Sequence, residues 1–217
     1  MVRENYDSQL KELRHQLLRM GSLVEEEITG SVSALVNRNV DLAQKIIADD
    51  DAVDNFHNEI EDLCLRLIAT QQPIAKDLRR IVTGLKIIGE LERMADHAVD
   101  IAKITLKIAP DPLIKPLIDI PRMSEYVRKM VRNSLDAYVN EDVALAESVG
   151  ADDDLVDHLH NQIFRELLTY MMEDASKISQ ATQLLFVSRY LERIADRATN
   201  ICESVIYLVT GNRQEIN

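Results

Sequence analysis

Two stretches of this chain repeat acidic residues at helical spacing. Residues 91–101 read LERMADHAVDI and residues 191–201 read LERIADRATNI, and seven of these eleven positions are identical. Residues four apart in an α-helix lie on one face, so the glutamate and the first aspartate of each copy form a pair. Because like charges at this spacing destabilise a helix, each pair favours a basic neighbour or a bound cation.

A second acidic pattern precedes each copy. Asp50 and Asp54 are four residues apart in ADDDAVD, and Asp153 and Asp157 are four apart in ADDDLVD. Acidic side chains cap free N–H groups and suit the positive end of the helix dipole. We therefore expect each segment to begin a helix.

The two acidic patterns of each repeat fall in a predicted helical hairpin. In the first repeat a helical apolar pattern ends at residues 71–73, QQP, and a further helix starting at the proline runs to about Ala109. Helices joined by a tight turn run antiparallel, and Asp54 and Glu92 lie about 17 and 20 residues from the turn, so their levels differ by about 5 Å. In the second repeat, a turn near residue 175 likewise brings Asp157 level with Glu192 or Asp196.

Each hairpin can therefore gather carboxylates from two facing helices. Oxygen ligands suit hard cations such as Mg²⁺, Ca²⁺, Mn²⁺ and iron. The candidate metal ligands are Asp50, Asp54, Glu92, Asp96 and Asp100 in the first repeat, and Asp153, Asp157, Glu192, Asp196 and Asn200 in the second.

Other interpretations of the acidic rows stay open. Arg93 and Arg193 directly follow the glutamates and could supply the counter-charge, in which case no metal is needed. Charged rows are also typical of solvated helix faces. His57 and His160 follow the aspartates in D-x-x-H, but the apolar neighbours of His57 favour a position at the edge of the core.

The acidic patterns belong to a duplicated helical unit. An offset of 103 aligns residues 40–60 with 143–163, and an offset of 100 aligns the later acidic copies. Gly (6) and Pro (5) are scarce and Trp is absent, which favours helices over strands. Four of the five prolines lie in residues 110–121, which indicates a linker with a new helix near Met123. We predict an all-α fold of two pseudo-symmetric antiparallel three-helix bundles, residues 1–109 and 122–217.

Composition and motifs narrow the classes of function that this chain can have. A formal charge of −12 argues against nucleic acid as a partner and permits cations and basic protein surfaces. The polar N-terminus and the lack of a long apolar run favour a cytoplasmic location. Cys64 and Cys202 fit reduced core positions. Neither nucleotide-binding glycine motif nor a GxSxG elbow occurs, so no catalytic residue is assigned.

The two copies of LER-x-AD-x-A, at residues 91–98 and 191–198, resemble the signature of the PhoU family of phosphate-uptake regulators. The ADDD segments and the two-times-three-helix layout are similar as well, so the resemblance covers essentially the whole chain. Asp100 departs from the pattern, in which Asn is usual, as at Asn200.

The resemblance implies a non-enzymatic regulator that represses the phosphate-starvation response. Such proteins couple a phosphate ABC transporter, through its ATPase subunit, to a membrane sensor histidine kinase. Family members can bind iron, zinc or another divalent cation at the acidic motifs and commonly form homodimers, with membrane contact only through partners. The alternative is a carboxylate-bridged metalloenzyme, which would need inward-facing ligands and a substrate pocket.

Overall fold

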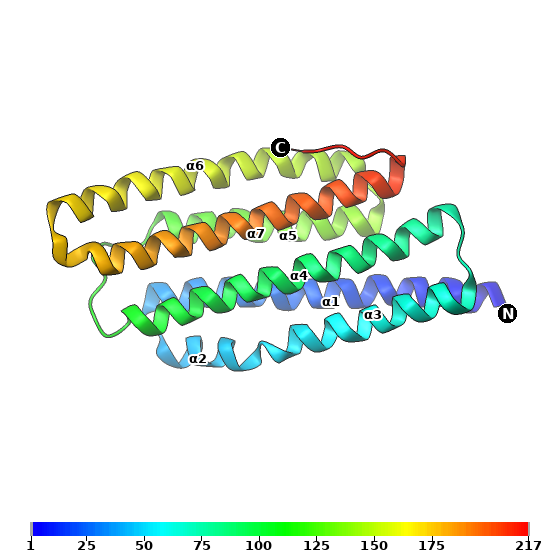
Figure 1. The fold of residues 1–217 in the computed structure, drawn as a ribbon, viewed down its shortest axis with the longest axis horizontal. Helices are drawn as coiled ribbons and strands as arrows, with labels where there is room; N and C mark the ends of the chain where they lie inside the picture. Colours follow the sequence, from blue (N-terminus) through cyan, green and yellow to red (C-terminus); the bar gives the residue numbers. More distant parts are fainter. Residues whose placement is uncertain (1, 217) are drawn as a thin grey trace.

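The computed structural model describes residues 2–216, with side chains from residue 6 onward, and all regular structure in this range is helical. The all-α prediction is therefore confirmed. No helix in the described range is both long and apolar enough to cross a membrane. Figure 1 shows the long helices running side by side along the longest axis. The elements are α1 (Val2–Asn37), α2 (Val40–Asp49), α3 (Asp51–Gln71), α4 (Ala75–Ile108), α5 (Asp119–Asn140), α6 (Val143–Glu173), η1 (Ala175–Lys177) and α7 (Ile178–Thr210).

The duplication is visible in the turns that follow α1 and α5. Arg38 and Glu141, which are 103 positions apart, both adopt left-handed backbone conformations with φ of 50° and 53°. Asn39 and Asp142 then cap the next helix, each accepting the N–H three residues further on at 3.0 Å. Equivalent positions therefore end and begin the helices of both repeats by the same local chemistry.

The ADDD segments do not both begin helices. In the first repeat Asp50 separates α2 from α3, but its side chain makes no capping hydrogen bond. In the second repeat α6 continues through this segment, with Asp152 and Asp153 buried in its interior. The predicted helix start is therefore wrong for Asp153. Lys129 of α5 pairs with Asp152 at 2.9 Å, which offsets the cost of burying that carboxylate within the helix.

The linker is shorter than the proline pattern suggests. α5 begins at Asp119 rather than near Met123, so Pro121 lies in its first turn. The first N–H groups of a helix have no intrahelical acceptor, and proline is tolerated there because it removes a donor that would be unpaired. Similarly, α4 begins at Ala75, after Pro73 rather than at it.

Both repeats contribute to one continuous hydrophobic core. α4 of the first repeat packs along α7 of the second, and Leu91, Met94, Leu191 and Ile194 are completely buried between the surrounding helices. α1 also packs on α5, which completes the contact between the repeats. The two predicted bundles are therefore present as repeats, but their cores merge.

The α4–α7 contact has an internal pseudo-twofold relation. Glu90 of α4 accepts a hydrogen bond from Arg197 of α7 at 3.4 Å. At the equivalent positions Tyr190 of α7 stacks on His97 of α4, with ring centroids 5.4 Å apart. Residue 90 therefore contacts residue 197, and the equivalent residue 190 contacts residue 97, as expected for a self-complementary interface.

Candidate functional site

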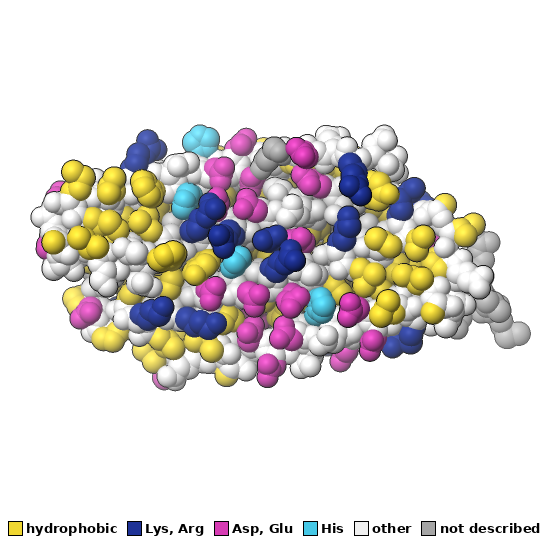
Figure 2. All heavy atoms as spheres, in the orientation of Figure 1, with side chains coloured by type: hydrophobic (Ala, Val, Ile, Leu, Met, Phe, Trp, Pro, Cys, Tyr) yellow, Lys and Arg dark blue, Asp and Glu magenta, His cyan; other side chains and the backbone are white. Residues whose placement is uncertain are grey.

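The two acidic copies occupy equivalent surfaces. Along residues 91–100 and 191–200 the order of buried, half-buried and exposed positions is the same. Asp96 and Asp196 are exposed, and Glu92 and Glu192 are half-buried. Figure 2 shows acidic side chains gathered over α3 and α4 and again over α6, with Lys and Arg side chains between the two groups. The acidic rows therefore face solvent rather than the bundle interior.

The first acidic cluster joins α1, α3 and α4. Partial burial, the charge of Asp54 and the charge of Asp96 raise the pKa of Asp50. Glu27 of α1 lies against this group, and burial, followed by the charges of Asp50, Asp49 and Asp54, raises its pKa to about 8. The structure thus brings together Asp50, Asp54 and Asp96, and adds a carboxylate that was not predicted.

Two other predicted residues of the first repeat have different partners. Glu92 lies 3.4 Å from Nε2 of His57, and Asp100 lies 3.6 Å from Nζ of Lys103. The His57–Glu92 contact confirms the predicted register of the α3–α4 hairpin. It also draws Glu92 toward a basic partner and away from the aspartates.

The second acidic cluster joins α6 and α7. Burial and the charge of Asp196 raise the pKa of Glu192, and burial and the charge of Asp157 raise the pKa of Asp196. Arg189 donates a hydrogen bond to Glu192. The first repeat has Gly89 at the position of Arg189, so this arginine has no counterpart in the first cluster.

Arg93 and Asn200 lie together in the groove between α4 and α7. The guanidinium of Arg93 is 3.7 Å from Glu90 and its side chain is 58% exposed. Arg93 therefore does not supply counter-charge within the cluster of Asp50, Asp54 and Asp96. In the second repeat Arg193 contributes modestly, since its charge is among those that lower the pKa of Asp196.

The fit of a cation can be judged from the oxygens that lack partners. In the described part of the chain, no three His, Cys, Asp or Glu side chains stand in metal-ligand geometry. Oε2 of Glu27 and Oε2 of Glu192, however, are buried without a hydrogen-bond partner. A buried carboxylate oxygen without a donor is costly, and a cation would satisfy it. The clusters are therefore chemically suited to a cation.

Sequence reasoning missed Glu27, Arg189 and Lys129. The signal for Glu27 was its place in the EEE run at 25–27, next to the apolar stripe of its helix. Local spacing shows that Glu27 adjoins the core-facing stripe, but it does not show which element the residue will face.

Residues 17–105 and residues 120–205 each match the PhoU domain. The chain belongs to the PhoU family. The two matched segments coincide with the two repeats, so the duplication seen in the sequence and turns is a duplication of the PhoU domain.

Relatives agree with this assignment over the full length. The chain is 47% identical over 218 residues to a phosphate-specific transport system accessory protein PhoU homolog of Clostridium acetobutylicum, with 100% of each chain covered. It is 43% identical to the homolog of Aquifex aeolicus, over 94% of this chain and 92% of that one. These relatives are named as accessory proteins, which gives no support to the metalloenzyme alternative.

Solved PhoU structures share the fold. The crystal structure of PhoU from Pseudomonas aeruginosa superposes with a TM-score of 0.90 at 37% identity, covering 95% of this chain and 100% of that one. The phosphate transport system regulatory protein PhoU from Streptococcus pneumoniae superposes with a TM-score of 0.89 at 31% identity, covering 96% and 99%.

Proposed function

We propose that this protein is an accessory regulator of phosphate uptake that represses the phosphate-starvation response. The observation that carries the proposal is 47% identity, across both entire chains, to a phosphate-specific transport system accessory protein. In this role it couples the ATPase subunit of a phosphate ABC transporter to a sensor histidine kinase. A cytoplasmic location and a homodimer accompany this proposal as predictions.

An exposed apolar surface supports a role in protein binding. Phe164, Leu168 and Met172 recur every four residues near the end of α6, and Ile178 and Phe186 lie on the adjoining start of α7. Met172 is 81% exposed. Figure 2 shows apolar side chains gathered at the end of the molecule where Figure 1 places the α6–α7 turn. We name these five residues the α6–α7 apolar tip and propose that it contacts the transporter ATPase, because contiguous exposed apolar surface marks protein interfaces.

Recovery of partners from cells grown in phosphate-rich medium tests this function. We expect tagged protein to recover the transporter ATPase and the sensor kinase, identified by mass spectrometry. The double change Phe164→Asp and Met172→Asp should lower ATPase recovery about tenfold, since charges would be buried at the contact. Leu65→Asp is the matched control, because Leu65 is 53% exposed and equivalent to Leu168 in the other hairpin. Recovery of neither partner by native protein would contradict the proposed function.

We also propose that the carboxylate clusters bind divalent cations, including iron and zinc. Asp50, Asp54 and Asp96, with Glu27, would hold one cation, and Asp157, Glu192 and Asp196 would hold another. Burial and then neighbouring carboxylates raise the pKa of Glu27, Asp50, Glu192 and Asp196, and a bound cation would offset both effects. The protein contributes the helical spacing and the hairpin register that place the oxygens side by side.

Titration of chelator-treated protein with Mn²⁺, Fe²⁺ and Zn²⁺ tests cation binding. Ligands that bind only the folded state must raise the melting temperature with concentration. The double change Asp54→Asn and Asp96→Asn should remove the cation of the first cluster and lower the number of metal ions bound per chain by one. Glu92→Gln is the control, because Glu92 contacts His57 and should leave the stoichiometry nearly unchanged. The proposal fails if native protein shows no metal-dependent shift, or if the double variant keeps full stoichiometry.

A further inference from the structure

A hollow lies between α4, α7 and the segment that follows α7. Its volume is about 530 Å³, and it adjoins a second hollow of about 500 Å³ in the same groove. Both hollows share Lys86, Glu203 and Ser204. The first is completed by Tyr207, Arg213, Gln214 and Glu215. It lies apart from the carboxylate clusters. Its lining includes two basic side chains, Lys86 and Arg213, and two acidic ones, Glu203 and Glu215.

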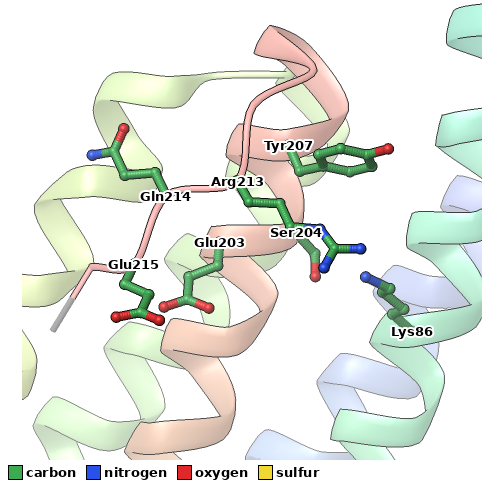
Figure 3. A pocket seen from close by; sticks show the side chains of 7 residues that line it. All are labelled: Lys86, Glu203, Ser204, Tyr207, Arg213, Gln214 and Glu215. Carbon is green, nitrogen blue, oxygen red and sulfur yellow. The ribbon is translucent and has the colours of Figure 1, made fainter.

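Three hydrogen-bond donors converge in this hollow. Figure 3 shows the ammonium of Lys86, the guanidinium of Arg213 and the hydroxyl of Ser204 turned toward one another from α4, the C-terminal segment and α7. The carboxylates of Glu203 and Glu215 lie near each other and away from the basic groups. The arrangement therefore separates a donor-rich part of the hollow from its acidic part.

The two cations lack an internal counter-ion. Arg213 stacks over the ring of Tyr207 at 5.9 Å, and Glu203 accepts the backbone N–H of Ile216 at 3.2 Å. Among the side chains that the structure describes, neither Lys86 nor Arg213 forms an ion pair. Both side chains are exposed, and an anionic ligand between them would be attracted by both charges.

The hydroxyl of Ser204 is also available to a ligand. Ser134 and Ser188 bond back to the carbonyl three residues earlier, at 2.8 and 2.9 Å. Within the described residues Ser204 forms no such bond, although it lies in the same kind of helical backbone. Its hydroxyl therefore retains its capacity to donate.

The arrangement is specific to one end of the pseudo-twofold groove. The positions equivalent to Lys86 and Ser204 in the other repeat are Phe186 and Ile104. The other end is therefore apolar where this end is basic and polar. Lys86, Ser204 and Arg213 are therefore a feature of this end of the groove rather than a requirement of the repeat.

We propose that this hollow binds a phosphate-bearing oxyanion, with Lys86 and Arg213 holding its charge and Ser204 donating to one of its oxygens. Charge-assisted bonds to phosphate oxygens are stronger than neutral ones, and arginine and lysine are the usual phosphate-binding side chains. The volume exceeds that of a phosphate ion and is in the range of small-ligand sites, so inorganic phosphate and a nucleoside monophosphate share the required chemistry. This inference goes beyond the proposed function, because it assigns the protein a direct anionic ligand.

Calorimetric titration of phosphate-free, chelator-treated protein tests the proposal. Inorganic phosphate, AMP and adenosine are titrated at one ionic strength set with potassium chloride. We expect saturable one-to-one binding of a phosphate-bearing ligand and none of adenosine. Lys86→Gln and Arg213→Gln should each raise Kd about tenfold, and Ser204→Ala by about threefold. Lys107→Gln is the matched control, since Lys107 is exposed on the same helix about 30 Å away.

Each outcome bears on the proposal. If inorganic phosphate binds as tightly as AMP, the ligand is the free ion; if AMP binds at least tenfold more tightly, the ligand is a nucleotide. Saturable binding of neither ligand, or unchanged binding in the double variant Lys86→Gln and Arg213→Gln, would overturn the proposal. Thermal melting confirms that each variant is folded. Failure here would leave partner recovery unaffected, so it is distinguishable from failure of the proposed function.

Discussion

Glu27 lies against Asp49, Asp50 and Asp54, and one of its carboxylate oxygens is buried without a hydrogen-bond partner. Its pKa of about 8, against 4.5 for an ordinary glutamate, follows first from burial and then from the three aspartates. The folded protein therefore holds a proton on Glu27 at neutral pH that the unfolded chain releases. At the scale of single residues, Glu27 is therefore a position where ionisation opposes folding.

Glu27 makes stability fall as pH rises. Between pH 4.5 and 8 the folded state binds more protons at this residue than the unfolded state, so the free energy of unfolding decreases with pH. Glu27→Gln mimics the protonated form at every pH. In metal-free protein at pH 9 the variant should be more stable than native protein by about 1–2 kcal/mol, a value discounted for the partial exposure of the side chain.

Urea unfolding at pH 6 and pH 9 measures this difference. Glu26→Gln is the control, because Glu26 is an exposed carboxylate beside Glu27 on the same helix. The control should follow the native pH dependence, while Glu27→Gln should flatten it. Parallel pH dependences for all three proteins would show that Glu27 is ionised in the folded state.

At the scale of helices, Gly21 lies in a tightly packed contact and Gly89 beside open space. A Cβ at Gly21 of α1 would lie 2.1 Å from Cδ1 of Leu135 in α5, whereas a Cβ at Gly89 of α4 would meet nothing within 4 Å. Both glycines lie inside helices, where alanine is intrinsically favoured by about 1 kcal/mol. The close approach of α1 to α5 thus depends on the missing side chain at Gly21.

Gly89→Ala should stabilise the protein by about 0.5–1 kcal/mol, because only helix propensity changes. Gly21→Ala should be less stable than Gly89→Ala by about 1–3 kcal/mol, because Leu135 must shift within a filled core. Denaturant unfolding of the pair measures the difference. Equal stabilisation by both changes would mean that α1 and α5 are not in close contact at Gly21.

At the scale of the whole molecule, the repeats are joined by core packing and by ion pairs. Arg132 of α5 pairs with Glu25 of α1 at 2.6 Å. Arg80 of α4 pairs with Glu141, at the end of α5, also at 2.6 Å. Together with the buried α4–α7 contact, these ion pairs link the stability of each repeat to the folding of the other.

The two repeats should therefore unfold together. Scanning calorimetry of the full chain should show one transition, with equal calorimetric and van't Hoff enthalpies. The variant Leu191→Ala, placed in α7, should lower the melting temperature of that single transition by several degrees, because it leaves a cavity in the shared core. Two resolved transitions, with only one shifted by the variant, would show that the repeats are independent domains.

Local spacing in the sequence determined the helical content, the duplication and the hairpin register. Each depends on residues near one another in the chain, and the His57–Glu92 contact lies where that register places it. Spacing misplaced the helix starts at Asp153 and Met123. Whether an aspartate is buried in a helix interior depends on a distant lysine, and proline is compatible with a first turn.

Only the tertiary structure decided which carboxylates meet and which cations remain unpaired. Glu27 joins Asp50 because α1 packs against the α2–α4 segment, and no local pattern encodes that contact. Lys86, Ser204 and Arg213 converge because α4 packs along α7 and the chain turns back after Gly211. Periodicity shows which face of a helix is buried, whereas the partner of that face is selected by the packing of the whole chain.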